Sequence, residues 1–498
     1  MEQTSFQIPI DHYLVEHFSA NQCCEERERQ RLEQKYAKQL EVSEAFNRQS
    51  VSYQLSKNDV LHSWLKYKEA FSADLVNLLL DEMGATAGDL VMDPFMGSGT
   101  TALVCQMRGI HSIGYDIMPI TEISLKAKSA CTQYSLAELR ELLRAIQTLD
   151  MPETYQKSTP YVTITQDAYP EETARYLQFI SEWREGAAFS TDAKNLLTLC
   201  IINALERISY TSKAGQYLGW DCRSKKVQAA NQRRQRKGQP PLPKKYVRAE
   251  ILPAKETILG ELEHVIAEIA MIQQNSRTHN TAHIEYVANS ALYEIPKLQD
   301  NILTGVITSP PYCNRYDYTR TYALELVYLG ADDRSIKKMR QDLLSCTVES
   351  KSKIEALREH YKRIGKSARF EAIYAKIQEN AAFSEIMTAL TIRKERGDLN
   401  NSGVVRMVEG YFTELAFVYA ELFRICKPGA MVAFVNDNVR YGGEVIPVDF
   451  LSCSFAEQFG FQVKTIYALK QKKGNSSQQM AKFGKVGLRK GITVWVKE

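Results

Sequence analysis

The feature that most constrains the fold is a short apolar run that ends in an acid and passes directly into a glycine loop. Residues 89–93 (DLVMD) have the composition of a buried strand, and PFMGSGTT follows them. The next stretch, TALVCQMRG, predicts a helix closed by Gly109, and the apolar run 111–116 (HSIGYD) predicts a second strand ending at Asp116. A strand, a glycine loop, a helix and a strand in this order open a doubly wound parallel α/β sheet.

Long insertions separate the remaining strands of this sheet. The next strand-like segment, 282–288 (AHIEYVA), lies far along the chain from Asp116, and so long a gap in a compact domain indicates a folded insertion. Apolar residues at helical spacing in 195–208 and 256–270 predict that this insertion is helical. The pattern from 330 to 403 predicts a second helical insertion.

Further α/β units are predicted in the C-terminal third. Residues 305–308 predict a strand that runs into SPPY, and GYFTELAFVYAELFRIC is apolar enough to form a largely buried helix over 410–426. A turn and a strand follow in 427–437, and FQVKTIYALK and GITVWVKE predict a final strand pair. Near the N-terminus, CEERERQRLEQKYAKQLEVSEAF (24–46) predicts a charged, solvated surface helix.

The glycine loop predicts a cofactor site at the carboxyl edge of the sheet. Gly97 and Gly99 leave out side chains in a turn whose backbone N–H groups point into the crevice beyond the strand. The loop has neither the Gly-Lys-Ser/Thr of a phosphate loop nor the third glycine of the dinucleotide fingerprint. Asp116 is placed to accept hydrogen bonds from both ribose hydroxyls of an adenosine. An ordinary turn and a helix N-cap are the alternatives for the glycines and for Asp116.

A second turn, Thr308-Ser309-Pro310-Pro311-Tyr312, ends another apolar strand and therefore lies at the same edge. Two prolines fix φ and remove two N–H donors, which leaves carbonyl oxygens free to accept. Acceptors suit an exocyclic base amine, because hydrogen bonds from its N–H groups to Ser309 Oγ and the Pro310 carbonyl help this poor nucleophile to attack. Tyr312 offers a face on which an extruded base can stack. A structural Pro-Pro turn with a core tyrosine is the alternative.

Together the two motifs resemble those of the amino-group DNA methyltransferases of restriction–modification systems. In that family the cofactor loop reads D-P-F-x-G-S-G-T-T and the catalytic turn reads S/D/N-P-P-Y/F. The resemblance covers about 52–120 and 282–498. It implies a Rossmann-like methyltransferase sheet, S-adenosylmethionine as cofactor and methyl transfer to a base of double-stranded DNA. Serine in the first position of the turn goes mainly with cytosine N4 and aspartate mainly with adenine N6, so Ser309 implies cytosine N4, with adenine N6 as the alternative.

The resemblance also implies the residues of the site. The catalytic residues would be Ser309, Pro310, Pro311 and Tyr312. Asp116 would hold the ribose, and a helix at 66–71 looks like the family's additional cofactor-binding segment. Where the family often has Gly-Asp-Ser near the adenine, Asn289 replaces the acid. The implied cofactor-binding residues are Lys68, Phe71, Asp93, Pro94, Phe95, Gly97, Ser98, Gly99, Thr100, Asp116, Asn289 and Ser290, among which Asp93, Phe95, Gly97 and Gly99 would hold the methionine part.

This motif order allows target recognition to lie between the two motifs, and it predicts six segments along the chain. These are an N-terminal helical segment (1–50), the cofactor-binding half of the methyltransferase domain (51–120), a helical insertion with a basic loop as the candidate target-recognition region (121–280), the catalytic part of the domain (281–329), a second helical insertion (330–403) and the C-terminal part of the domain (404–498).

Two basic stretches are candidates for contacts with DNA phosphates. The first, 223–248, holds ten Lys or Arg and no acid, and its Gln, Pro and Gly residues predict an exposed loop. The second, 458–497, holds nine cations and no acid, and NRYDYTR beside the catalytic turn adds cations and aromatics. A solvated surface is the alternative for each. The predicted nucleic-acid-binding residues are Arg223, Arg233, Arg234, Arg236, Lys237, Arg315, Arg320, Lys472 and Lys473.

Other features exclude or weaken further classes of protein. The chain has no signal segment and no apolar run long enough to span a membrane, so we expect a soluble, cytoplasmic protein without membrane partners. Its ten cysteines are scattered without C-x-x-C or Cys/His ligand spacing, which predicts reduced thiols and no metal site.

Three alternative activities remain open at this point. Cys313 could suggest a cytosine C5 methyltransferase, but Tyr312 separates it from the prolines. An RNA amino-methyltransferase would use the same chemistry, and an inactive nucleic-acid-binding subunit would keep the fold. No endonuclease motif is evident, so a restriction endonuclease or another defence-system subunit would be a separate chain.

Overall fold

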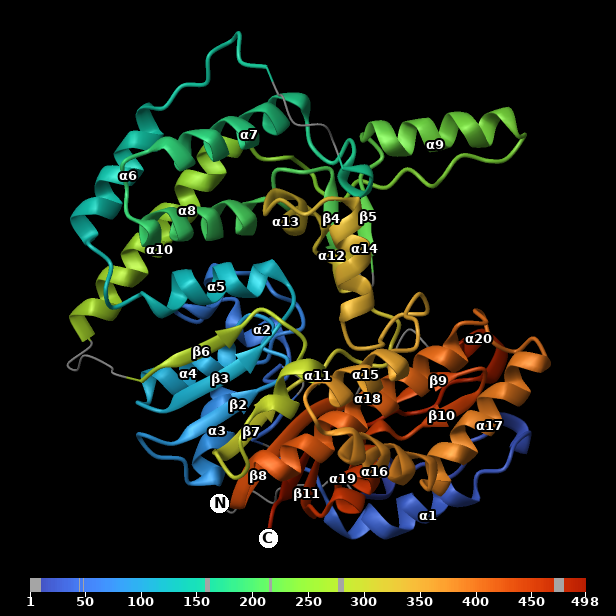
Figure 1. Ribbon diagram of the computed structural model, residues 1–498. Coiled ribbons are helices and arrows are strands. Elements are labelled where there is room, and N and C mark those ends of the chain that lie inside the picture. Colours follow the sequence, from blue (N-terminus) through green and yellow to red (C-terminus); the bar gives the residue numbers. More distant parts are fainter. Residues whose placement is uncertain are drawn as a thin grey trace, which may run out of the picture.

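In the computed structural model, one eight-stranded sheet runs through the molecule (Figure 1). The structure describes residues 10–43, 45–47, 49–156, 162–214, 217–275, 282–469 and 479–498. In spatial order the strands are β1 (Leu40–Glu41), β11 (Gln462–Leu469), β12 (Lys490–Val496), β8 (Cys426–Asp437), β7 (Leu303–Thr308), β2 (Leu90–Asp93), β3 (His111–Tyr115) and β6 (Ile284–Val287). β12 runs antiparallel to both neighbours, and every other pair in the sheet is parallel.

The strand order reverses beside β2. From there β3 and β6 extend the sheet in one direction, whereas β7 and β8 extend it in the other. A reversal of this kind leaves a crevice outside the carboxyl ends of the two central strands, where doubly wound sheets bind their ligands. The sheet confirms the predicted Rossmann-like α/β class, and the predicted final strand pair is β11 and β12.

Helices cover both faces of the sheet because successive side chains of each strand point to opposite sides. Val91 and Val435 belong to the buried cluster under α3 (Ala73–Met83) and α4 (Thr100–Met107). Their neighbours Met92 and Phe434 belong to the cluster under α18 (Val404–Ile425) and α19 (Val448–Phe459), on the other face. The sheet is therefore the middle of three layers.

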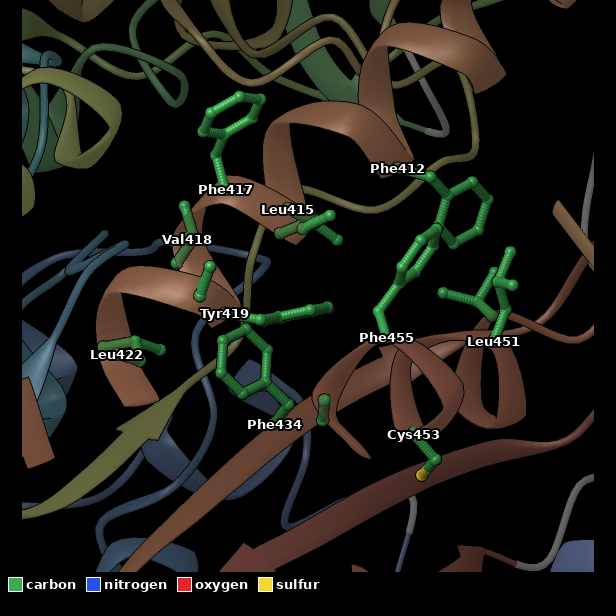
Figure 2. Close-up of a cluster of buried hydrophobic side chains, with 14 of the residues drawn as sticks. Phe412, Leu415, Phe417, Val418, Tyr419, Leu422, Phe434, Leu451, Cys453 and Phe455 are labelled. Atoms are coloured by element: carbon green, nitrogen blue, oxygen red, sulfur yellow. The ribbon is translucent and has the colours of Figure 1, made fainter. Parts of the chain in front are cut away.

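A core cluster joins α18, α19 and β8 (Figure 2). Leu415 and Tyr419 of α18 lie between Phe455 of α19 and Phe434 of β8, and the Tyr419 and Phe434 rings meet edge to face with centroids 5.1 Å apart. α18 is buried along most of its length, which explains why its sequence is largely apolar. The buried helix predicted over 410–426 is confirmed and begins earlier than expected.

Between β3 and β6 the chain forms a mostly helical body, as the spacing in 195–208 and 256–270 predicts (Figure 1). Its main helices are α5 (Pro119–Ser129), α6 (Leu136–Thr148), α7 (Glu171–Gly186), α8 (Thr191–Ala204) and α10 (Ala254–Asn275). An antiparallel hairpin, β4 (Thr211–Ala214) and β5 (Tyr217–Trp220), has no counterpart among the predicted elements.

The basic stretch 223–248 is not a loop throughout, and in this respect the prediction is wrong. It begins with α9 (Lys225–Arg236), whose N-cap Ser224 accepts a hydrogen bond from Val227 N. Alanine, glutamine, lysine and arginine are good helix formers, and the prolines that break helices start only at Pro240, after the helix has ended. α9 has no buried residue, and in Figure 1 it projects away from the helical body.

The second insertion is helical, as predicted for 330–403. Its helices are α14 (Asp333–Asp342), α15 (Ile354–Arg363), α16 (Ser367–Gln378) and α17 (Ala381–Glu395), and two short helices, α12 (Tyr318–Thr321) and α13 (Ala323–Tyr328), precede them. The other short elements are α2 (Tyr53–Ser56), α11 (Ala291–Glu294), α20 (Met480–Phe483) and the hairpin β9 (Val439–Tyr441) with β10 (Glu444–Ile446).

The charged N-terminal helix α1 (Arg27–Tyr36) packs against α17 and α19. Its stripe of Leu32 and Tyr36 is buried, and so is one of its cations, Arg29. The Arg29 guanidinium pairs with Glu385 and Glu444, each at 2.9 Å. A helix predicted to be a solvated surface element therefore carries a buried ion-pair network.

All ten cysteines are free thiols in the structure, and seven of them are buried. Among the described residues, no helix is long and apolar enough to cross a membrane. The same part of the chain contains no cluster of three or more His, Cys, Asp or Glu side chains that could hold a metal ion.

Candidate active site

A pocket lies at the carboxyl ends of β2, β3, β6 and β7, where the strand order reverses. Including its open mouth it encloses about 710 Å³, within the range of small-molecule sites. Residues that line it are Tyr67, Glu69, Ala70, Phe71, Pro94, Phe95, Met96, Gly97, Ser98, Thr100, Tyr115, Asp116, Ile117, Met118, Asn289, Ser290, Ala291, Ser309, Pro311, Tyr318, Asp342, Leu343 and Leu344.

Glycines in the loop after β2 allow other groups to approach the backbone closely. Gly97 and Gly99 both have positive φ, at 53° and 82°, which favours glycine. A Cβ on Gly97 would lie 3.1 Å from the Tyr67 ring, and one on Gly99 would lie 2.4 Å from the Leu125 side chain. The loop is further held by Thr121, whose hydroxyl donates to the Gly97 carbonyl at 2.7 Å. Its backbone therefore forms a rigid edge of the pocket.

Asp116 follows β3 and also faces the pocket. Its carboxylate accepts hydrogen bonds from Gly97 N at 2.9 Å and from Met118 N at 2.8 Å, so it links the glycine loop to the start of α5. Burial raises the pKa of Asp116 to about 6, although these hydrogen bonds oppose the shift. A carboxylate with this environment titrates close to the physiological range.

Asp93 ends β2 but does not line the pocket. Its buried carboxylate accepts hydrogen bonds from the Thr308 hydroxyl at 2.6 Å and from Phe95 N at 3.0 Å. Burial raises its pKa to about 6, against the effect of these hydrogen bonds. Since Thr308 ends β7, Asp93 ties the glycine loop to the SPPY turn.

The segment 66–71 is not a helix, which corrects the prediction. It is a turn between a short 3₁₀ turn, His62–Trp64, and α3, which begins after its N-cap Ser72. Tyr67 stacks on Tyr322 with ring centroids 4.7 Å apart. Lys66 N donates to Asn203 Oδ1 and Lys68 N donates to the Tyr322 hydroxyl, each at 2.9 Å, so these backbone donors are engaged by side chains from outside the segment.

Within this turn the pocket is lined by Tyr67, Glu69, Ala70 and Phe71, whereas Lys68 points away. Lys68 Nζ donates to the Lys213 carbonyl in β4 at 2.6 Å. The Glu69 carboxylate accepts a hydrogen bond from the Tyr322 hydroxyl, and burial raises its pKa. Of the two residues that the resemblance implies in this segment, Phe71 lines the pocket and Lys68 does not.

Ser309 and Pro311 of the SPPY turn line the pocket, whereas Pro310 and Tyr312 do not. Ser309 Oγ lies 3.2 Å from the Tyr312 hydroxyl and 3.3 Å from the Val435 carbonyl oxygen. The serine hydroxyl is thus held where the crevice meets the catalytic turn. Cys313 is fully buried and burial raises the pKa of its thiol, which argues against a cysteine nucleophile.

Beside the turn lies a charged pair that the sequence patterns did not indicate. Lys490 and Asp437 are register partners on β12 and β8, and Lys490 Nζ lies 3.4 Å from Asp437 Oδ1. The same ammonium sits over the Tyr312 ring, 5.1 Å from its centroid. Burial disfavours the charge of Lys490, but Asp437 and Tyr312 outweigh it and raise its pKa.

At the far side of the pocket, Asn289 and Ser290 follow β6, as the resemblance implies. Asn289 Oδ1 accepts a hydrogen bond from Ser290 N at 2.8 Å, and Asn289 Nδ2 donates to Glu294 at 2.5 Å. The amide is therefore engaged within its own turn. Asp342, Leu343 and Leu344 reach the same pocket from the second insertion, a long-range approach that no local pattern signals.

The predicted nucleic-acid-binding residues that the structure describes lie on different elements and differ in their partners. Arg233, Arg234, Arg236 and Lys237 lie on α9 or directly after it, and all four are at least partly exposed. Arg223 instead pairs with Asp221 at 2.7 Å, an acid just before the acid-free stretch. Arg320 pairs with Asp317 and Glu349, each at 3.1 Å, and Arg315 donates to Asn400 at 2.8 Å. Lys472 and Lys473 lie outside the described residues.

Known proteins match the chain along most of its length. A family model described as DNA methylase matches residues 13–124. The Type II methyltransferase M.BsoBI of Geobacillus stearothermophilus is 48% identical over 485 residues, which cover 97% of this chain and 95% of the relative. The chain belongs to the Type II DNA methyltransferases. The Type II methyltransferase M.AvaI, from Nostoc sp. and from Anabaena variabilis, is 36% identical over 481 residues, covering 94% of this chain and 92% of the relative.

Membership confirms the resemblance drawn from the two motifs. The protein is an amino-methyltransferase of the restriction–modification type, and its methyl donor is S-adenosylmethionine. The pocket at the switch point fits such a molecule, because the carboxylates of Glu69, Asp116 and Asp342 line it and Gly97 brings the backbone of the glycine loop to its edge.

Proposed function

We propose that this methyltransferase modifies the exocyclic N4 amine of cytosine in double-stranded DNA. The observation that carries the proposal is Ser309, whose hydroxyl lies at the meeting point of the pocket and the SPPY turn. Serine in this position goes mainly with cytosine in the family that the motifs resemble. A hydroxyl can accept one amine hydrogen while it donates to the Val435 carbonyl.

In this proposal the residues of the pocket and the turn divide the work. Phe95, Gly97, Ser98 and Thr100 hold the methionine part of the cofactor, and Asp116 accepts from its ribose. When bound, the cofactor supplies a methyl group on a positively charged sulfur. Ser309 Oγ and the Pro310 carbonyl accept hydrogen bonds from the target amine, which favours pyramidal nitrogen and keeps its lone pair directed at the pocket.

Tyr312 and the Lys490–Asp437 pair define the other side of the turn. We infer that the target base, extruded from the duplex, stacks on Tyr312, a contact worth about 1–3 kcal/mol for base–aromatic stacking. Asp93 acts indirectly, since its bond to Thr308 fixes the distance between the two loops. It is a positioning residue.

The exposed cations of α9 are proposed to contact DNA phosphates. Arg233, Arg236 and Lys237 are exposed, and none of the ion pairs of the described residues involves them. Phosphate contacts set affinity and register, while contacts to base edges set the sequence. Contacts to base edges would come from the helical body between β3 and β6. A cognate restriction endonuclease would be a separate chain.

Identification of the methylated nucleoside tests the proposal. The purified protein is incubated with methyl-labelled S-adenosylmethionine and, in separate reactions, unmethylated phage DNA and total RNA, and the products are digested and analysed by mass spectrometry. We expect N4-methyldeoxycytidine from DNA only. N6-methyldeoxyadenosine would overturn the choice of base, and labelled RNA would overturn the choice of DNA.

Two variants relate this product to the turn. Ser309→Ala should lose most turnover while its cofactor affinity stays within about twofold, because the hydroxyl contacts the acceptor amine rather than the cofactor. Ser384→Ala, an exposed serine on α17, is the matched control and should retain full activity. An equal loss of cofactor affinity and rate in Ser309→Ala would assign the serine to cofactor binding instead.

A further inference from the structure

The last residue of α14, Asp342, brings a carboxylate from the second insertion into the cofactor pocket. α14 begins with a capping box at Asp332 and Ser335 and ends where Leu343 N bonds to the Met339 carbonyl. The next two residues, Leu343 and Leu344, also line the pocket. One acid and two leucines from a segment outside the methyltransferase motifs therefore form part of its wall.

This position is unfavourable for a carboxylate in the absence of a ligand. The C-terminal end of a helix carries partial negative charge, so an acid there is repelled. Among the described residues, no ion pair or hydrogen bond involves the Asp342 side chain. Its neighbour Arg340 pairs with Asp317 at 2.9 Å, and Lys353 pairs with Glu414 at 2.9 Å, so nearby cations serve other acids.

The Asp342 carboxylate lies near the segment that follows β6. Burial raises the pKa of Tyr293 in α11, and Glu414 and Asp342 raise it further, so Asp342 is within electrostatic reach of α11. Asn289 begins this segment, and its amide is engaged by Ser290 and Glu294. The residues of this segment that line the pocket, 289–291, include no carboxylate, and Asp342 supplies one from the second insertion.

We propose that Asp342 accepts a hydrogen bond from the exocyclic N6 amine of the cofactor's adenine and that Leu343 and Leu344 cover the ring. A carboxylate is an acceptor without a donor, so it favours an amine over a carbonyl oxygen at this place. The second insertion thereby completes the cofactor site. The proposal rests on the assignment of the pocket to S-adenosylmethionine, and it does not depend on which base is methylated.

Binding of two ligands that differ at the N1–C6 edge of the purine ring tests the proposal, because the inosyl ring has a carbonyl oxygen on C6 and a proton on N1. S-adenosylhomocysteine carries the N6 amine, and S-inosylhomocysteine carries a carbonyl oxygen there. Calorimetry on the full chain should show that the wild type prefers the adenosyl ligand by about tenfold or more, as expected for a charge-assisted hydrogen bond replaced by a repulsive pair. Asp342→Asn should weaken binding of the adenosyl ligand and strengthen binding of the inosyl ligand, because the amide can donate to the carbonyl.

Control variants separate this role from general effects. Glu359→Gln removes one exposed negative charge of α15 in the same insertion and should leave both affinities unchanged. Asp342→Asn should also melt at a temperature no lower than the wild type without ligand, because it removes an unpaired charge from a helix C-terminus. A preserved melting temperature shows that the variant folds.

Two results would overturn the proposal. If Asp342→Asn leaves the ratio of the two affinities unchanged, Asp342 does not contact the N6 position, whether or not both affinities fall. If Asp116→Ala binds S-adenosylhomocysteine as tightly as the wild type, the pocket itself is misassigned. The second result would fail the cofactor assignment, whereas the first would fail only the role of Asp342.

Discussion

Cofactor affinity should depend on pH through Asp116. Burial raises the pKa of this carboxyl to about 6, and we propose that its ionised form accepts the ribose hydroxyls. At pH 5 only about one Asp116 in eleven is ionised in the free protein, so the apparent affinity for S-adenosylhomocysteine should be about tenfold weaker than at neutral pH. This corresponds to about 1.4 kcal/mol of binding free energy.

Calorimetry between pH 5.0 and 7.5 measures this dependence. The affinity should be constant above pH 7 and should fall by at most tenfold per pH unit below pH 6. Near pH 6, where about half of Asp116 is protonated, binding should release about half a proton, which shows as a buffer-dependent enthalpy. Asp116→Asn should bind more weakly and lose this linkage, although Asp93 and Glu69 remain titratable in it.

The stability of the cofactor-free protein should change with pH in the opposite direction. The folded pKa of Asp116 is raised above its unfolded value of about 3.9, so the folded state binds the proton more tightly. Protonation between pH 6 and 4 therefore stabilises the fold while it weakens cofactor binding. A flat affinity across the range, or the same proton release in Asp116→Asn, would refute a ribose contact by the ionised carboxyl.

Two further perturbations test the cations of α9 and the N-terminal helix α1. Four cations of α9 and its end are replaced together by Gln: Arg233, Arg234, Arg236 and Lys237. The slope of log affinity for duplex DNA against log salt should fall by up to about 3.6, at about 0.9 per phosphate contact, and the sequence preference should be kept. A control variant with Lys362→Gln and Arg363→Gln should keep the wild-type slope. An unchanged slope in the α9 variant would show that these α9 cations are only solvated surface. Arg29→Met should lower the free energy of unfolding in urea by about 3–5 kcal/mol, because the largely buried Glu385 loses its cation and the buried Glu444 keeps only Arg393. Arg31→Met, whose side chain is 57% exposed, should change it by less than about 0.5 kcal/mol, and equal effects of the two variants would contradict the role of burial.

Local signals in the sequence were sufficient for seven strands of the sheet and for the two motifs, but not for β1, which lies in the stretch 24–46 that predicts a helix. A strand that ends in a glycine loop needs only neighbouring residues to be read, and the same holds for the strand before SPPY. Because parallel strands end at one edge, placing Gly97 and Ser309 near one another followed from topology alone. The switch point between β2 and β7 confirms that placement.

Side chains that depend on distant partners could not be read in the same way. Charge in 24–46 predicts a solvated helix, but Arg29 meets Glu385 and Glu444, which lie hundreds of residues further along the chain. A stretch of cations with prolines at its end predicts a loop, but the helix-forming residues before Pro240 are enough for α9. The composition of each stretch is compatible with two structures. Long-range packing decides whether Arg29 is buried or solvated, and the position of a helix boundary decides whether the basic stretch is a helix or a loop.

Asp93 shows the same limit within a recognised motif. The resemblance implies that it holds the cofactor, yet its carboxylate is directed at Thr308 and Phe95 N rather than into the pocket. A motif identifies a residue by its position in a strand and a loop, whereas its role depends on what ends the neighbouring strand. Thr308 precedes Ser309 by one residue, so the hydrogen bond from Thr308 to Asp93 links the glycine loop to the SPPY turn. The two motifs therefore lie side by side in space, because β2 and β7 are adjacent strands and because the buried Asp93 carboxylate fixes the position of one loop relative to the other.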